Sequence, residues 1–375
     1  MQTVIIVGGG ISGLHTAYEL AKQGVKFKLL EATSRLGGRI LSRPSERDRL
    51  TTSRYDLGPS WFWPGQTAIE LLIHELGLKP NVFAQYADGD SVFEPIDSPL
   101  QRGIPGISMQ GSLRISGGWQ TVIESLESAV LGLAGNDAIL YEHAVSSLEY
   151  KSDGVRLRVA NSAQLFTAQH VILAMPPRVA VNTMAFSPKL PKSRISELNS
   201  LATWMAGHAK AVCTYEYAFW REAGFSGDVI SQRGPLAEIH DASLSGDASQ
   251  LGDASSPDQN RHALFGFFAT PPTQRNNDLA EIKQSIIQQL VRLFGEKAQN
   301  PLDILYQDWA RNPFVATEFE QQIANHHSLS SLSTIEEVGW GQRLIWSGTE
   351  VAQGQIKGYI EGAIAASQNA LEAIR

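Results

Sequence analysis

The first 31 residues place the strongest constraint on the fold of this chain. Residues 3–7 form an uninterrupted run rich in Val and Ile, as expected of a strand covered on both faces. A glycine-rich segment, residues 8–13, follows, and residues 14–23 have the apolar spacing of a helix. A second apolar run, residues 26–30, ends at Glu31. This order predicts a βαβ unit at the start of an α/β fold.

The glycines and the acidic residue of this unit have the spacing of a dinucleotide-binding turn. Gly8 permits the tight turn, Gly10 lets a pyrophosphate approach the backbone, and Gly13 lets the helix lie close to the strand. The helix N-terminus presents free N–H groups to the phosphates. Glu31 can accept hydrogen bonds from both ribose hydroxyls and would repel a 2′-phosphate, which favours FAD or NAD over NADP. The alternative is a glycine turn that serves only the packing of the helix and binds no dinucleotide.

A second glycine pair distinguishes FAD from NAD. The segment Arg35-Leu-Gly-Gly-Arg39 follows closely after Glu31. This segment resembles the flavin-containing amine oxidases, the group of monoamine and polyamine oxidases, in which its glycines and arginines wrap the FAD diphosphate. An arginine fork suits a diphosphate because it makes paired, charge-assisted hydrogen bonds. For either arginine alone, the alternative is a solvated surface charge.

The resemblance continues through nearly the whole chain. It covers residues 55–65, 207–221, 306–313, 343–350 and 358–363. It implies that FAD is noncovalently bound by Gly8, Gly10, Ser12, Gly13, Glu31, Ala32, Arg35, Gly37, Gly38, Arg39, Gly58, Pro59, Ser60, Val145, Trp309, Gly348, Thr349, Glu350, Tyr359 and Ile360. The final helix, expected over residues 363–375, would begin beside the flavin and stabilise its reduced anion through the helix dipole.

Lys210 and Tyr359 are the catalytic candidates. The resemblance implies that Lys210 holds a water against flavin N5 and that Tyr359 forms one wall of an aromatic cage around the amine. The alternative for Lys210 is a lysine on an edge strand with its charge in water. Trp61, Trp63, Phe314 and Tyr359 are expected in the substrate pocket, although three consecutive aromatic residues at 61–63 are also typical of a core.

The implied reaction is the oxidation of an amine. A neutral amine presents its α C–H to flavin N5, hydride transfer gives an imine, and water hydrolyses the imine to an aldehyde or ketone. Dioxygen then reoxidises the flavin and yields hydrogen peroxide. Cys213, the only cysteine, lies outside the segment in which monoamine oxidases carry their cysteine, so the FAD should be noncovalent. No metal is expected, because His326 and His327 read as solvated neighbours in a polar loop.

The resemblance also predicts two interleaved domains. Residues 1–60, 114–177 and 336–375 are expected to form a Rossmann-like FAD-binding domain of the p-hydroxybenzoate hydroxylase type. Residues 61–113 and 178–335 are expected to form a substrate-binding domain, a mixed sheet with helices.

Two segments of the substrate-binding domain are expected to lack regular structure. Residues 84–113, rich in Gly, Pro, Asp and Ser, are expected to be irregular. Residues 241–259, of low complexity, are expected to form a mobile surface loop, with a lid over the site as the alternative.

Composition excludes some classes of function. The net charge of −7 and the pI of about 5.8 give no basic surface for nucleic acid. A strand that begins at residue 3 leaves no room for a signal peptide. Residues 363–375 are too short and polar to span a bilayer. Together with the single cysteine, these features predict a cytoplasmic protein without a transmembrane anchor.

Two other functions stay open at this stage. A desaturase or another C–C or C–N dehydrogenase of the same superfamily would share the FAD motifs. A flavin-bound binding partner without turnover would keep Gly10 and Glu31 and tolerate loss of Lys210 and Tyr359. The sequence does not identify the amine, the physiological electron acceptor, the second wall of the cage or the oligomeric state.

Overall fold

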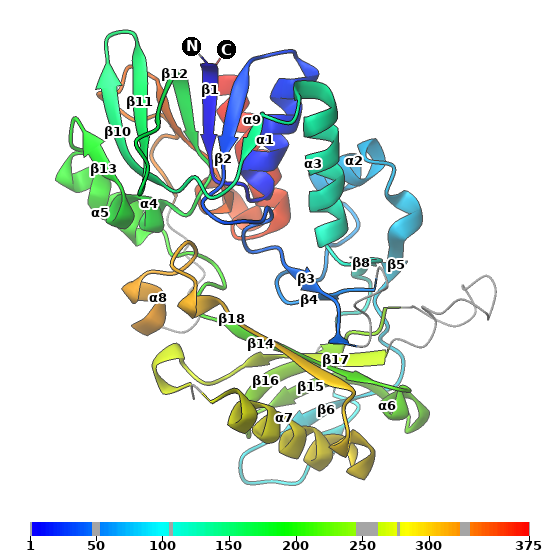
Figure 1. Ribbon diagram of the computed structural model, residues 1–375. Helices are drawn as coiled ribbons and strands as arrows, with labels where there is room; N and C mark the ends of the chain where they lie inside the picture. The colour runs from blue at the N-terminus through cyan, green and yellow to red at the C-terminus, as the bar shows by residue number, and fades with distance from the viewer. Residues whose placement is uncertain are drawn as a thin grey trace.

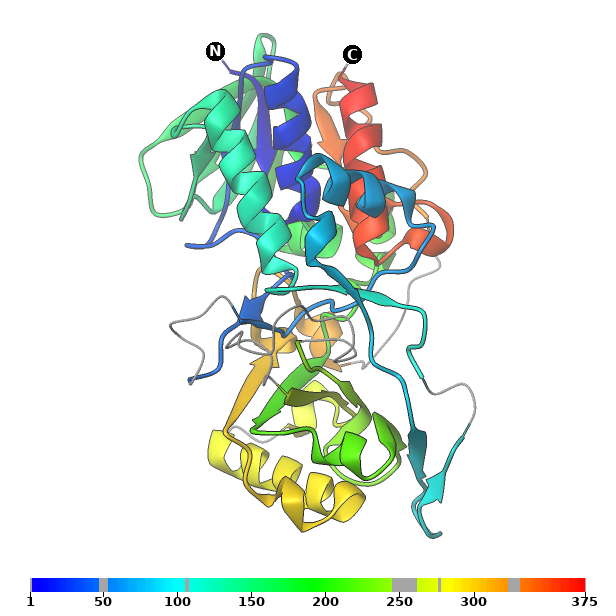
Figure 2. The same ribbon diagram turned by 90° about the vertical axis from the view of Figure 1, so that its right-hand side faces the viewer.

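The computed structural model describes residues 2–46, 53–104, 108–244, 262–275, 278–322 and 331–374. Two lobes, each built on one large β-sheet, are stacked on each other (Figures 1 and 2). Among the described residues, no helix has the length and apolar character needed to cross a membrane. His326, His327 and most of the segment 241–259 lie outside the described residues.

The upper sheet contains the predicted βαβ unit. Strand β1 lies between β2 and β12 and is parallel to both, with Val4 opposite Phe27 and His170. The sheet order is β13-β10-β11-β12-β1-β2-β9, and β19 pairs with β12 off this path. The strands are β1 (Gln2–Val7), β2 (Phe27–Leu30), β9 (Ile139–Leu140), β10 (Val145–Lys151), β11 (Gly154–Val159), β12 (Leu165–Leu173), β13 (Ala185–Ser187) and β19 (Leu344–Trp346).

Helices cover both faces of this sheet, which explains the uninterrupted apolar run of β1. Val4 and Ile6 pack into one core with α1, α3 and α9, whereas Ile5 and Val7 pack into a second core with α4 and α5. Alternate residues of a strand point to opposite faces, so a strand covered twice is apolar throughout. The helices are α1 (Ile11–Lys22), α2 (Thr67–Glu75), α3 (Gln120–Ala134), α4 (Pro177–Thr183), α5 (Lys192–Ser200) and α9 (Ile360–Ala373).

Parts of the expected substrate-binding ranges lie in the upper lobe. Strand β13 pairs with β10, and α4 and α5 pack in the second core, although all three lie between residues 177 and 201. Helix α2 packs against α9, and Glu361 of α9 accepts hydrogen bonds from the N–H groups of Ala68 and Ile69. The division of the chain into an FAD-binding domain and a substrate-binding domain at the residues given above stays a prediction.

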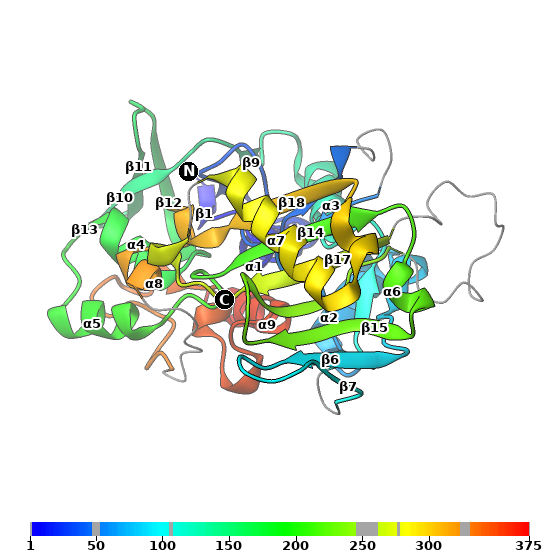
Figure 3. The ribbon, with the colours of Figure 1, turned by 90° about the horizontal axis from the view of Figure 1, so that it is seen from below.

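The lower sheet has the order β18-β14-β17-β16-β15-β6-β7. Helix α7 (Leu279–Phe294) crosses one face of it (Figure 3) and buries Ile282, Ile286 and Leu290 there. Asp278 caps this helix by accepting a hydrogen bond from the N–H of Ala280. The strands are β6 (Asp90–Glu94), β7 (Gln101–Arg102), β14 (Ala209–Tyr215), β15 (Phe225–Ser231), β16 (Leu236–Asp241), β17 (His262–Phe268) and β18 (Asp303–Asp308).

The expectation that residues 84–113 are irregular is wrong in part. Strand β6 pairs with β15, and β7 pairs with β6. The remaining described elements are short: β3 (Ser42–Arg43) pairs with β4 (Tyr55–Asp56), β5 (Val82–Ala84) pairs with β8 (Leu113–Ile115), and two further helices are α6 (Phe219–Glu222) and α8 (Glu318–Gln322).

Candidate active site

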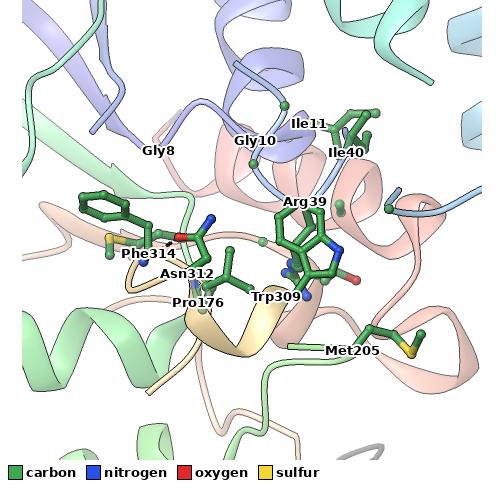
Figure 4. Close-up of a pocket in the computed structure, with 18 of the residues that line it drawn as sticks. Gly8, Gly10, Ile11, Arg39, Ile40, Pro176, Met205, Trp309, Asn312 and Phe314 are labelled. Carbon is green, nitrogen blue, oxygen red and sulfur yellow. Dashed lines mark hydrogen bonds between the residues drawn. The ribbon is translucent and has the colours of Figure 1, made fainter. Parts of the chain in front are cut away.

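A cavity of about 950 Å³ lies between the two lobes. Of the cofactor-binding candidates, all except Gly13 line it, and so do Lys210 and the substrate-pocket candidates Trp61, Trp63, Phe314 and Tyr359. Figure 4 shows the turn at Gly8 and Gly10 on one side of this cavity, with Arg39 and Trp309 opposite. The structure thus gathers residues from both ends of the sequence, such as Gly8 and Ile360, around one space.

Glycine is found at each of the three positions of the turn for a different structural reason. Gly8 has a φ of +107°, and a Cβ there would lie 2.5 Å from the carbonyl oxygen of Ala174. A Cβ at Gly13 would lie 2.0 Å from the carbonyl oxygen of Gly8, so Gly13 serves packing and does not line the cavity. Gly10 has an ordinary extended conformation, and nothing lies within 4 Å of a Cβ built there. Only Gly10 therefore leaves open space in the cavity.

Glu31 is held in one orientation at the end of β2. Its carboxylate accepts hydrogen bonds from the N–H of Gly9 at 2.7 Å, from the N–H of Thr33 at 2.9 Å and from the Thr33 hydroxyl at 2.7 Å. The side chain is buried and lines the cavity. Charge-assisted bonds of this kind fix a carboxylate where a ribose can reach it.

The two arginines of the second glycine motif, Arg35 and Arg39, form hydrogen bonds with other groups of the protein. Arg35 donates to the carbonyl oxygens of Leu36, Gly38 and Ile40, and it thereby shapes the glycine loop.

Arg39 forms an ion pair with Glu350, with 2.7 Å between Nη1 and Oε1, and donates to the carbonyl oxygen of Trp204. These contacts join the N-terminal turn to the C-terminal segment.

Lys210 lies on an internal strand, so the edge-strand alternative is wrong. Strand β14 has β17 on one side and β18 on the other, and Lys210 is 1% exposed. Its Nζ donates to Ser60 Oγ at 2.6 Å and to the Gly58 carbonyl at 3.1 Å, and it lies 3.8 Å from the ring centre of Phe265. Burial lowers the pKa of Lys210 to about 7. The amine can therefore gain or lose a proton near neutral pH.

The aromatic residues at 61–63 divide between site and core. Trp61 and Trp63 line the cavity, whereas Phe62 is buried in the core of the upper lobe against Trp119. Tyr359 is 41% exposed at the cavity wall.

The cavity wall also contains residues that were not expected from the sequence, among them Trp204, His208, Glu238 and Phe267. Trp204 lies 6.5 Å from Tyr359 between ring centres, with the planes at 53°. His208 could have been found, because it precedes Lys210 by two residues and a strand-like alternation places both on one face. Glu238 and Phe267 carry no local signal, because strand pairing brings them to the cavity, and Trp204 lies in a turn before β14 that no local pattern marks.

A parallel sheet, a glycine turn at its carboxyl edge and an acidic residue at the end of the next strand define a dinucleotide-binding protein. Comparisons with known proteins are more specific. A family model described as flavin containing amine oxidoreductase matches residues 107–375, and one described as an NAD(P)-binding Rossmann-like domain matches residues 6–76. The chain belongs to the flavin containing amine oxidoreductase family, and it is an FAD-dependent oxidoreductase.

The sequence matches to known relatives extend over most of this chain. A probable flavin-containing monoamine oxidase A of Dictyostelium discoideum is 22% identical, with 97% of this chain and 95% of the relative covered. The putrescine oxidase of Kocuria rosea is 22% identical over 84% of each chain. Among solved structures, putrescine oxidase bound to putrescine matches with a TM-score of 0.77 at 19% identity, covering 100% and 99% of the two chains. These structural matches confirm the predicted fold class.

The residues around the cavity fit FAD. The open space at Gly10 suits a pyrophosphate, the fixed carboxylate of Glu31 suits a ribose, and the cavity is large enough for a dinucleotide. Val145, at the start of β10, lines the same cavity. Gly348, Thr349 and Glu350 line the cavity beside the N-terminal turn.

Acid precipitation is expected to release all of the flavin into solution. Cys213, the single cysteine, is 1% exposed and packs in the core of the lower lobe, where it cannot reach a cofactor in the cavity. The measurement is the flavin absorbance of the supernatant after precipitation, with heat-denatured protein as a second sample. Yellow colour that stays with the precipitate would contradict noncovalent binding.

Proposed function

We propose that the enzyme oxidises a small primary or secondary amine to an imine, which water hydrolyses to an aldehyde or ketone, with dioxygen as the final acceptor. When bound, FAD supplies the redox chemistry: it takes up the hydride of the substrate and passes two electrons to dioxygen, which gives hydrogen peroxide. The observation that carries the proposal is Lys210, a buried amine with a pKa near 7 in the wall of an aromatic cavity.

We assign each residue a separate task. Lys210 Nζ, oriented by Ser60 Oγ and the Gly58 carbonyl, holds a water molecule and exchanges a proton with it. Tyr359 and Trp61 present ring faces and edges that orient an amine and exclude bulk water. The apolar surroundings favour the neutral form of the substrate amine, which has the lone pair that the reaction requires.

We also infer a cytoplasmic location. One buried cysteine in the whole chain suits a reducing compartment. Fractionation of cells that express the protein from its own gene would test this inference, and recovery with a membrane or organelle fraction would contradict it.

Mixing the yellow protein with amines in the absence of air tests the reaction. A panel of primary amines, secondary amines and polyamines is expected to contain members that bleach the flavin absorbance, and admission of air is expected to restore the colour with one hydrogen peroxide per flavin. Free FAD with the same amines is the control. A flavin that no amine bleaches would instead favour a desaturase, another dehydrogenase, or a flavin-bound partner without turnover. Bleaching followed by no peroxide would contradict dioxygen as the acceptor.

A further inference from the structure

The Lys210 amine forms hydrogen bonds with uncharged oxygen atoms. In the part of the chain that the structure describes, its bonds go to Ser60 Oγ at 2.6 Å and to the Gly58 carbonyl at 3.1 Å, and it forms no ion pair with a carboxylate. The nitrogen of a neutral lysine has two N–H groups and one lone pair. These two bonds use both N–H groups. The lone pair therefore remains for a molecule in the cavity, whose wall Lys210 helps to form.

Aromatic rings of β17 pack against this nitrogen. Lys210 Nζ lies 3.8 Å from the ring centre of Phe265 and 5.3 Å from that of Phe267, and the lysine is 1% exposed. Such rings keep bulk water away from the amine, which favours its neutral form over the ammonium ion. They also favour any condensation that releases water, because bulk water is not at hand to reverse it.

The proton affinity of Lys210 makes it a nucleophile near neutral pH. Burial has the largest effect on the pKa of this amine and lowers it to about 7. Asp56 of β4 and Glu238 of β16 act to raise the pKa, and Arg114 of β8 acts to lower it. A lysine with a pKa near 7 is about half neutral at pH 7, compared with about one molecule in 2,500 for an ordinary lysine with a pKa of about 10.4.

The proposed reaction produces electrophiles in the same cavity. Oxidation of an amine gives an imine, and hydrolysis of the imine gives an aldehyde or ketone. The carbon of each C=N or C=O bond is electron-poor and is attacked by neutral amines, as in the Schiff bases that reactive lysines form with carbonyl compounds. Product and nucleophile are therefore enclosed together.

We propose that Lys210 captures the carbonyl product of the enzyme as a reversible Schiff base, so that the enzyme is inhibited by its own aldehyde. The lone pair of Nζ attacks the carbonyl carbon, the carbonyl oxygen leaves as water with the two amine hydrogens, and a C=N bond replaces the C=O bond. No electrons are transferred, so no oxidant or reductant is needed. The imine of a primary amine reacts in the same way and releases ammonia. The inference rests on the proposed function for the source of the aldehyde.

The captured enzyme should react slowly with dioxygen. A Schiff-base nitrogen has at most one N–H, so it cannot keep both oxygen partners of Lys210 and hold a water molecule as well. Saturating benzaldehyde is expected to slow reoxidation of the chemically reduced protein by at least about tenfold, towards the rate of Lys210→Met. Removal of the aldehyde should restore the rate, because water hydrolyses the Schiff base.

Trapping with sodium cyanoborohydride tests the capture on the yellow protein without any amine substrate. Propanal and benzaldehyde are the probes. The reductant converts the C=N bond to a stable secondary amine, which adds the mass of the aldehyde less one oxygen atom. Peptide mapping at pH 7 should show Lys210 modified at least about 100-fold faster than the exposed Lys192, as the difference in neutral fraction allows. Lys210→Met should lose this modification and keep that of the exposed lysines and the amino terminus.

The outcomes separate this proposal from the proposed function. Modification of Lys210 no faster than that of Lys192 with both aldehydes would overturn the capture, even if amines are oxidised. Rapid modification with an unchanged rate of reoxidation would overturn the inhibition. If Lys210 is modified but no amine is oxidised, the proposed function fails and the capture of aldehydes stands. Mapping of the wild-type protein decides the question even if Lys210→Met does not fold.

Discussion

A Gly10→Val variant is expected to fold and to be purified without its yellow colour. Gly10 has a φ of −68° and a ψ of 174°, which valine adopts without strain, and no protein atom lies within 4 Å of its Cβ position. The branched side chain would enter the space that the pyrophosphate needs. Because Gly10 is the N-cap of α1, we expect a loss of about 1 kcal/mol in the free energy of unfolding of the FAD-free protein. Flavin absorbance per polypeptide and thermal unfolding measure the two effects.

Two other glycines serve as controls for this result. Gly13→Val should not fold, because its Cβ would lie 2.0 Å from the Gly8 carbonyl oxygen. Gly132→Ala, in α3 with nothing within 4 Å of its Cβ, should keep its flavin and gain about 0.5–1 kcal/mol. Full flavin content in Gly10→Val would show that the pyrophosphate does not approach this turn.

Lys210→Met is expected to keep FAD bound and to slow reoxidation by dioxygen by about 10²- to 10⁴-fold, the usual range for loss of a positioned proton-transfer group. Methionine has a similar length and no proton to exchange, and it cannot hold a water in place of Nζ. The measurement is stopped-flow reoxidation of the chemically reduced protein in aerated buffer. An unchanged rate with dioxygen would remove the role assigned to Lys210. Lys192→Met, at an exposed residue of α5, is the matched control.

The same substitution should stabilise the FAD-free protein. The pKa of Lys210 falls from 10.5 to about 7 on folding, so protonation favours the unfolded chain. The wild-type protein loses stability as the pH falls from about 10.5 to 7, and the full penalty is present below pH 7. Lys210→Met removes this penalty, by about 1–4 kcal/mol if it resembles other buried charges. Thermal unfolding across this pH range should show the largest difference between the two proteins at the acid end.

Local signals in the sequence predicted the upper lobe well. The Val and Ile run of β1 indicates a strand buried on both faces, and Gly13 indicates a close backbone contact with Gly8 of the same unit. These features depend on neighbours in the sequence. The final helix begins at Ile360, three residues before its predicted start at residue 363, and it includes Gly362. In the structure it is required for packing, since a Cβ there would lie 2.2 Å from the Ile356 carbonyl oxygen.

The lower lobe was harder to predict, because its sheet forms by pairing between segments that are distant in the sequence. Strand β6 has a polar composition and glycine and proline nearby, and it becomes a strand because β15 offers a partner. Lys210, Phe267 and Glu238 lie side by side because of the register in which β14, β17 and β16 pair. A single sequence does not reveal this register. The partner of Arg39 is Glu350, 311 residues away, so the ion pair at the cavity could not be predicted either.

The ion pair between Arg39 and Glu350 also has a consequence for biosynthesis. The first 40 residues leave the ribosome long before residues 348–363, which supply the opposite wall of the cavity. The glycine turn must therefore wait, without its cofactor enclosed, until translation reaches that segment. The flavin is then bound only near the end of translation or after it. A nascent chain halted before residue 348 would stay colourless.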